Sequence, residues 1–180
     1  MKKRSYQVAL GGMSAALSLL FMFMTGVLPF MDYALPALAG LMLVVVMVEL
    51  NAKWAVLVYI AVSLLAFFLA PLKESAVLYA AFFGYYAIVK SYLERIPNRI
   101  VEWVLKFLLF NAAVAAAFVL IIYVLGMTEM LEGLNEWGQW GLAGFWAAAN
   151  VVFLIYDIAL TRVIGAYLNW FRPKYLKKFS

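Results

Sequence analysis

Residues 100–125 read IVEWVLKFLLFNAAVAAAFVLIIYVL, and Gly126 closes the run. A helix needs about 20 mainly apolar residues to cross the hydrocarbon core of a bilayer, and this stretch is longer. Glu102 and Lys106 stand four residues apart, in the order that favours an ion pair along one helix. We therefore predict a membrane-spanning helix over 100–125, in which these two charges neutralise each other.

The rest of the chain repeats the pattern. Apolar stretches follow one another with short interruptions, and each interruption carries proline, glycine, asparagine or a cluster of charges, as turns do. The sequence therefore predicts an all-α integral membrane protein, a single bundle of six transmembrane helices that occupies residues 1–180. The predicted helices cover residues 6–28, 34–48, 54–70, 75–93, 100–125 and 140–167.

Composition supports a membrane protein and excludes several classes of chemistry. Of the 180 residues, 68% are hydrophobic and only 13% are charged, which leaves too little polar surface to cover a soluble domain. Cysteine and histidine are both absent. This excludes zinc sites built from these residues, thiol chemistry and catalysis that needs an imidazole base.

Basic residues set the expected orientation, because they stay on the cytoplasmic side. With the N-terminus inside and six alternating helices, Lys73 is the one basic residue placed outside, and both termini are cytoplasmic. The basic cytoplasmic face suits anionic membrane lipid, so the net charge of +5 requires no nucleic acid. The basic residues placed inside are Lys2, Lys3, Arg4, Lys53, Lys90, Arg95, Arg99, Lys106, Arg162, Arg172, Lys174, Lys177 and Lys178.

The first predicted helix carries small residues close to its N-terminus. Gly11 with Ala15, and Gly12 with Ala16, are both small-xxx-small pairs, which allow two helix backbones to approach closely in lipid. The pairs are expected either to pack within this bundle or to dock another subunit.

Polar residues within the spans are expected to face the interior of the bundle or a cavity. Asn111 and Asn150 suit hydrogen bonds between helices. Asp157 is expected to meet a cation near the cytoplasmic boundary: Arg162, Lys90 or Lys106.

A ligand site is predicted in the outer half, bounded by the last three predicted helices and covered by the segment 126–140. Aromatic walls with one or two amide groups suit a flat, partly polar small molecule. The fourth predicted helix carries an aromatic row, made of Tyr79, Phe82, Phe83, Tyr85 and Tyr86. Core packing is the alternative role for this row, and anchoring at the membrane interface is the alternative role for the tryptophans of the loop. The candidate residues are Tyr79, Phe83, Trp137, Trp140, Trp146 and Asn150.

No feature of the sequence indicates an enzyme. It has no glycine-rich phosphate loop, and Asp157 is alone rather than one of a pair of intramembrane aspartates. We expect neither a catalytic residue, a metal nor a cofactor, and the chain has no nucleotide motif with which to energise transport itself.

In topology, the chain resembles the substrate-binding S components of energy-coupling factor (ECF) transporters, the bacterial vitamin uptake systems. The segment 9–16, ALGGMSAA, stands where those proteins carry a small-xxx-small docking motif, with glycine in place of one alanine. The segment 156–162 and Arg172-Pro173-Lys174 are similar to the ends of such proteins.

The resemblance implies a location and a mechanism. The protein would lie in the bacterial inner membrane and bind a small molecule on its outer face. It would then dock on a transmembrane coupling subunit, which two cytoplasmic ATPases drive, and release the molecule inside the cell. The alternative from a different class is a membrane scaffold or assembly protein without a transported ligand, which would lack an outer pocket.

The predicted topology is tested by reporter fusions. Fusions after Lys53, Arg99 and Ser180 should report the cytoplasm, and a fusion within 129–136 should report the outside, because the basic residues are so unequally divided. An external signal from the fusion after Ser180 would contradict the count of six helices.

Overall fold

The computed structural model describes residues 2–28, 30–126 and 140–176. The chain divides into two compact units, Met1–Met127 and Thr128–Ser180. Whether the two units form the single predicted domain over residues 1–180 depends on how they join, so this domain stays a prediction.

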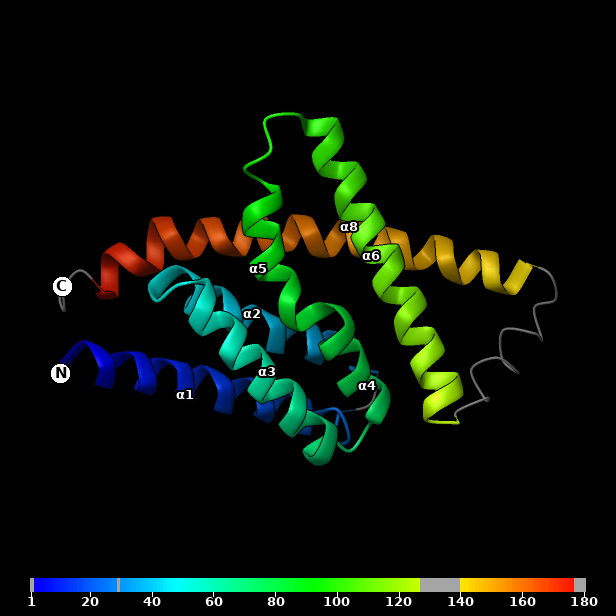
Figure 1. The fold of residues 1–180 in the computed structure, drawn as a ribbon, viewed down its shortest axis with the longest axis horizontal. Helices are drawn as coiled ribbons and strands as arrows, with labels where there is room; N and C mark the ends of the chain where they lie inside the picture. Colours follow the sequence, from blue (N-terminus) through cyan, green and yellow to red (C-terminus); the bar gives the residue numbers. More distant parts are fainter. Residues whose placement is uncertain (1, 29, 127–139, 177–180) are drawn as a thin grey trace. The chain divides into compact units, whose positions relative to one another are not determined.

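Within the described ranges, all regular structure is helical. The first unit contains α1 (Lys2–Met24), α2 (Ala34–Glu49), α3 (Ala52–Leu69), α4 (Lys73–Leu78), the π-helical turn η1 (Tyr79–Phe83), α5 (Gly84–Leu93), α6 (Arg99–Val119) and the π-helical turn η2 (Leu120–Val124) (Figure 1). The second unit contains α8 (Gly141–Ala166) and the π-helical segment η4 (Tyr167–Leu176).

Five helical stretches in the described part of the chain are long and apolar enough to cross a membrane, as in a multi-pass membrane protein. The remaining predicted stretch, residues 34–48, is also an apolar helix, α2, but it is shorter, with 16 residues. The all-α class is thus confirmed. The five long stretches are Arg4–Met24, Ala52–Leu69, Lys73–Leu93, Arg99–Tyr123 and Gly141–Trp170.

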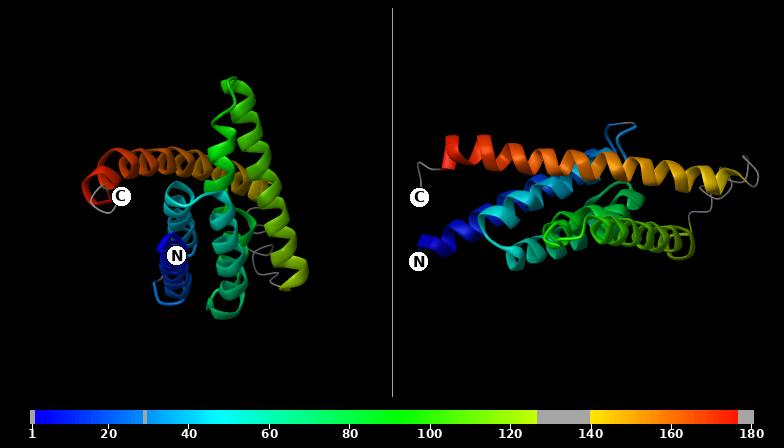
Figure 2. Two further views of the ribbon diagram at one scale, coloured as in Figure 1. Left: turned by 60° about the vertical axis from the view of Figure 1, so that its left-hand side comes forward. Right: turned by 90° about the horizontal axis from the view of Figure 1, so that it is seen from above.

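The short helix α2 forms the centre of the first unit. It packs against α1, α3, α5 and η1, and Figure 2 shows α1 and α2 side by side. Ala39, Leu43 and Val46 are completely buried. The hydroxyl of Ser18 on α1 donates a hydrogen bond of 2.9 Å to the Ala39 carbonyl, which joins the two helices at this core.

Local chemistry sets the starts of two helices. The Asn51 side chain accepts a hydrogen bond of 3.1 Å from the Trp54 backbone N–H and begins α3. The Asn98 side chain accepts one of 2.9 Å from the Ile100 N–H and begins α6. Asparagine is among the best residues for this position because its side chain satisfies an otherwise free N–H at the helix N-terminus.

Lys73 completes the C-terminus of α3. Its ammonium group donates to the backbone carbonyls of Phe67 at 2.9 Å and Ala70 at 3.0 Å. The last carbonyls of a helix have no partner within the helix, and a cation there also interacts favourably with the helix dipole. The one basic residue predicted outside is therefore engaged at a helix end.

Two of the predicted helices end several residues away from their C-terminal ends in the structure. The first helix ends at Met24 rather than at residue 28: the Thr25 hydroxyl donates to the Met22 carbonyl at 2.8 Å, and the chain then turns past Pro71. A Cβ atom on Gly26 would lie 2.5 Å from the Pro71 Cβ, so this approach requires glycine. The last helical stretch continues beyond Tyr167 to Leu176. The prediction ended it where the sequence becomes polar, but a polar sequence marks the edge of a membrane span and does not by itself end a helix.

The predicted helix 75–93 is interrupted by a π-helical turn. Within η1, the Ala80 carbonyl accepts a hydrogen bond of 2.6 Å from the Tyr59 hydroxyl on α3. Gly84, directly after η1, leaves room for two aromatic rings, because a Cβ atom there would lie 2.7 Å from Tyr59 Cδ2 and 2.8 Å from Tyr79 Cε1. The wider turn and the tyrosine that joins it to α3 thus form one packing unit.

Gly84→Ala should lower stability by about 1–3 kcal/mol, because the added methyl group overpacks two rings at a buried position. The measurement is the apparent melting temperature of the purified protein in detergent. Gly12→Ala is the matched control, since a Cβ atom on Gly12 meets nothing within 4 Å. Equal melting temperatures for both variants would contradict the close packing at Gly84.

Candidate functional site

The small residues of α1 divide into two rows with different surroundings. The inner row is Gly11 and Ala15. A Cβ atom on Gly11 would lie 3.5 Å from Val58 Cγ2 and 3.7 Å from Trp54 Cε3 of α3, and Ala15 packs against the buried core. This row therefore serves the packing of α1 on α3.

The outer row consists of Ala9, Gly12 and Ala16. All three residues are exposed, and no atom lies within 4 Å of a Cβ atom built on Gly12. Consecutive residues of a helix point about 100° apart, so neighbouring glycines serve different faces. The sequence left open which pair packs internally, and the structure assigns Gly11 with Ala15 to that role.

The predicted ligand residues of the first unit lie in or beside its core. Tyr79 is completely buried, and its ring centroid is 6.3 Å from that of Tyr59. Phe83 is partly buried and packs against the same core cluster. Both residues belong to η1, so this part of the aromatic row, predicted on a regular helix, follows a π-helical winding instead.

The remaining predicted ligand residues belong to the second unit. Trp140 precedes α8 and is exposed. Trp146 and Asn150 lie one turn apart on α8, and the Asn150 amide donates a hydrogen bond of 2.8 Å to the Trp146 carbonyl. Trp137 lies outside the described residues. The ligand site built from both units stays a prediction.

A network of charges joins α5 to α6. The Glu94 carboxylate lies 2.8 Å from the Lys90 ammonium and 3.5 Å from the Lys106 ammonium, and Glu102 lies 2.8 Å from Lys106. Both lysine side chains are buried, whereas Glu94 is 36% exposed. The predicted pair of Glu102 and Lys106 is confirmed. Its extension across the two helices by Glu94 was not predicted.

Sequence spacing carries a signal for part of this network only. Lys90 and Glu94 stand at i and i+4, as do Glu102 and Lys106, so each of these pairs is readable within one helix. The contact between Glu94 and Lys106 depends on how the turn after α5 folds back, which spacing does not specify. In the structure this contact makes one carboxylate the shared partner of two buried ammonium groups.

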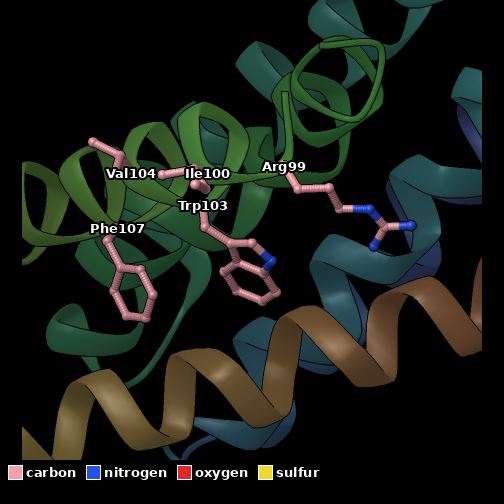
Figure 3. Close-up of a pocket in the computed structure, with 5 residues that line it drawn as sticks. All are labelled: Arg99, Ile100, Trp103, Val104 and Phe107. Atoms are coloured by element: carbon pink, nitrogen blue, oxygen red, sulfur yellow. The ribbon is translucent and has the colours of Figure 1, made fainter. Parts of the chain in front are cut away.

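One face of α6 combines an arginine with aromatic rings. Figure 3 shows Trp103 and Phe107 projecting from the same side of the helix, while Arg99 reaches out near its N-terminus. The ring centroids of Trp103 and Phe107 are 6.0 Å apart, and the Lys106 ammonium lies 5.1 Å from the Trp103 ring centroid. An open groove of about 480 Å³ on this face is lined by Arg99, Ile100, Trp103, Val104 and Phe107. Aromatic rings are enriched at the membrane–water interface, and cations interact favourably with their faces. This face of α6 therefore suits a position at that interface.

No protein-family model, curated protein or solved structure matches this chain.

Glu94→Gln should destabilise the protein by about 1–2 kcal/mol, because two buried ammonium groups lose a shared carboxylate, while the partial exposure of Glu94 reduces the loss. The measurement is again the apparent melting temperature in detergent. The control is Glu74→Gln in the first turn of α4, which removes a favourable interaction with the helix N-terminus worth about 0.3–1 kcal/mol. A smaller effect at Glu94 than at Glu74 would contradict the bridging role.

Proposed function

We propose that this chain is the substrate-binding S component of an ECF-type uptake transporter for a small vitamin-like molecule. In this proposal it spans the bacterial cell membrane six times, with both termini in the cytoplasm. The observation that supports the proposal best is the exposed outer row of α1, made of Ala9, Gly12 and Ala16. It is close to the N-terminus, where the resemblance places the docking motif.

Docking through this row has a simple physical basis. Between two helices in lipid there is no hydrophobic driving force, so association depends on close van der Waals contact, which small residues permit. Gly12 and Ala16 stand one turn apart and present little side chain above the backbone. The row is therefore a suitable place for a helix of the coupling subunit.

The two rows of α1 favour one of the two possible docking pairs. Of the two pairs in the segment 9–16, Gly11 with Ala15 is occupied by α3. The proposal accordingly assigns docking to Gly12 with Ala16. One helix then serves the fold on one face and the partner on the other.

The sixth span in this proposal is α2. Its 16 residues rise about 24 Å, less than the roughly 30 Å of the hydrocarbon core. Because α1, α3, α5 and η1 pack against it, neighbouring helices cover much of this short helix, and a short helix is tolerated where protein rather than lipid surrounds it. This supports a six-helix count with one short central member.

The test is co-purification with a co-expressed coupling module, made of the transmembrane coupling subunit and its two ATPases. Ala16→Leu should reduce the recovered module at least tenfold, which corresponds to about 1.4 kcal/mol, because the larger side chain keeps the helices apart. The isolated variant should keep its melting temperature, since Ala16 is exposed.

Two further variants make the test specific. Ala61→Leu makes the same change at an exposed alanine of α3 and should leave recovery unchanged. Ala15→Leu should instead lower the melting temperature, because Ala15 packs against the core. Failure of the wild-type protein to retain the module would favour the scaffold, and equal losses for Ala16→Leu and Ala61→Leu would reject the assigned row.

A further inference from the structure

The open groove on α6 has one charged end and an apolar length. Arg99, the first residue of the helix, stands at one end, and Phe107 lies eight residues further along. Eight residues of α-helix rise about 12 Å, close to the roughly 15 Å of hydrocarbon in one leaflet of a bilayer. Between these ends the wall is apolar, because Ile100 and Val104 are exposed and Trp103 is half-buried.

The guanidinium group of Arg99 is exposed and has no carboxylate partner among the residues that the structure describes. The two acidic side chains nearest to it in sequence, Glu94 and Glu102, are held by the buried lysines of the network that joins α5 to α6. Residues 90–106 contain four basic and two acidic side chains, so this region keeps an excess of positive charge. The partner that Arg99 can still take is an anion from outside the chain.

Trp103 offers a second donor in the same groove. Its indole N–H can only donate, and within the described part of the chain it makes no hydrogen bond. Figure 3 shows the indole nitrogen on the edge of the ring that faces Arg99. The Lys106 ammonium, 5.1 Å from the centroid of this ring, and the Phe107 ring, 6.0 Å away between centroids, pack against the indole and fix its position.

The charged end and the apolar wall together favour an anionic phospholipid. The fork of a guanidinium group binds two phosphate oxygens at once, and the indole N–H can donate to a further headgroup oxygen. An acyl chain would cover the apolar wall, which offers nothing to a free phosphate ion. A zwitterionic headgroup would bring its own ammonium group into a region with excess positive charge, whereas an anionic headgroup would not.

We propose that this groove binds one anionic phospholipid, with the phosphate at Arg99 and Trp103 and an acyl chain along Val104 and Phe107. Residues of the first unit alone supply the site. The proposal uses neither the outer row of α1 nor the ligand residues predicted from the sequence, so it goes beyond the proposed function.

The test is native mass spectrometry of the full-length protein in detergent, titrated with phosphatidylglycerol or with phosphatidylcholine that carries the same acyl chains. The wild-type protein should bind the first phosphatidylglycerol about fivefold more tightly than the first phosphatidylcholine. Arg99→Gln should lower the affinity for phosphatidylglycerol about five- to tenfold and remove most of this preference. Trp103→Phe, which keeps a ring and loses the N–H, should lower it about two- to fivefold.

Arg95→Gln is the matched control. Arg95 is also exposed, but its guanidinium group lies 5.2 Å from the centroid of the Tyr92 ring, and it does not line the groove. This variant should keep the wild-type affinity and preference. Equal losses for Arg99→Gln and Arg95→Gln would show a general attraction between a basic protein and an anionic lipid, and would overturn the proposal.

The wild-type protein provides the second decisive result. Equal affinity for the two lipids would also overturn the proposal, and it is the result expected if a helix of the second unit covers the groove. Both arginines are exposed, so neither substitution should change the melting temperature, and the comparison of the variants does not depend on folding.

Discussion

In a bilayer, no water is present to satisfy a backbone carbonyl that loses its helical partner, and the first unit is organised around this constraint. Where winding changes at η1, the Tyr59 hydroxyl meets the Ala80 carbonyl. Where α3 ends, the Lys73 ammonium meets its last carbonyls. The contacts that satisfy the backbone thus also fix α3 against the neighbouring segments.

Charged side chains, like backbone carbonyls, need a partner when they are buried away from water. Lys90 and Lys106 are buried, and a buried charge is tolerated when it is paired. The shared carboxylate of Glu94 connects α5 to α6 beyond the short turn between them. Some of the polar contacts in the first unit hold different helices to one another, such as Ser18 with the Ala39 carbonyl and Glu94 with Lys106.

Much of the helical content could be predicted from apolar runs, because lipid requires long uninterrupted helices. The starts at Asn51 and Asn98 agree with ordinary capping chemistry, and the pair of Glu102 and Lys106 follows from its spacing. The π-helical turn at 79–83 could not be predicted, since YAAFF has good apolar character and no glycine or proline. It depends on Tyr59, which is distant in sequence. The different surroundings of Gly11 and Gly12 likewise depend on where α3 packs.

The π-helical turn has a consequence for the phase of everything that follows it. Such a turn holds more residues per revolution than an α-helical turn. It therefore rotates the side chains that follow it about the helix axis, as an inserted residue would, and adds little to the length of the helix. Side chains after Phe83, including Lys90, face their present directions because of that offset. The pairing of Lys90 with Glu94 lies within α5, but the direction in which this pair faces α6 is set in the middle of the span. The π-helical turn at 79–83 therefore sets which way the side chains of α5 face relative to those of α4.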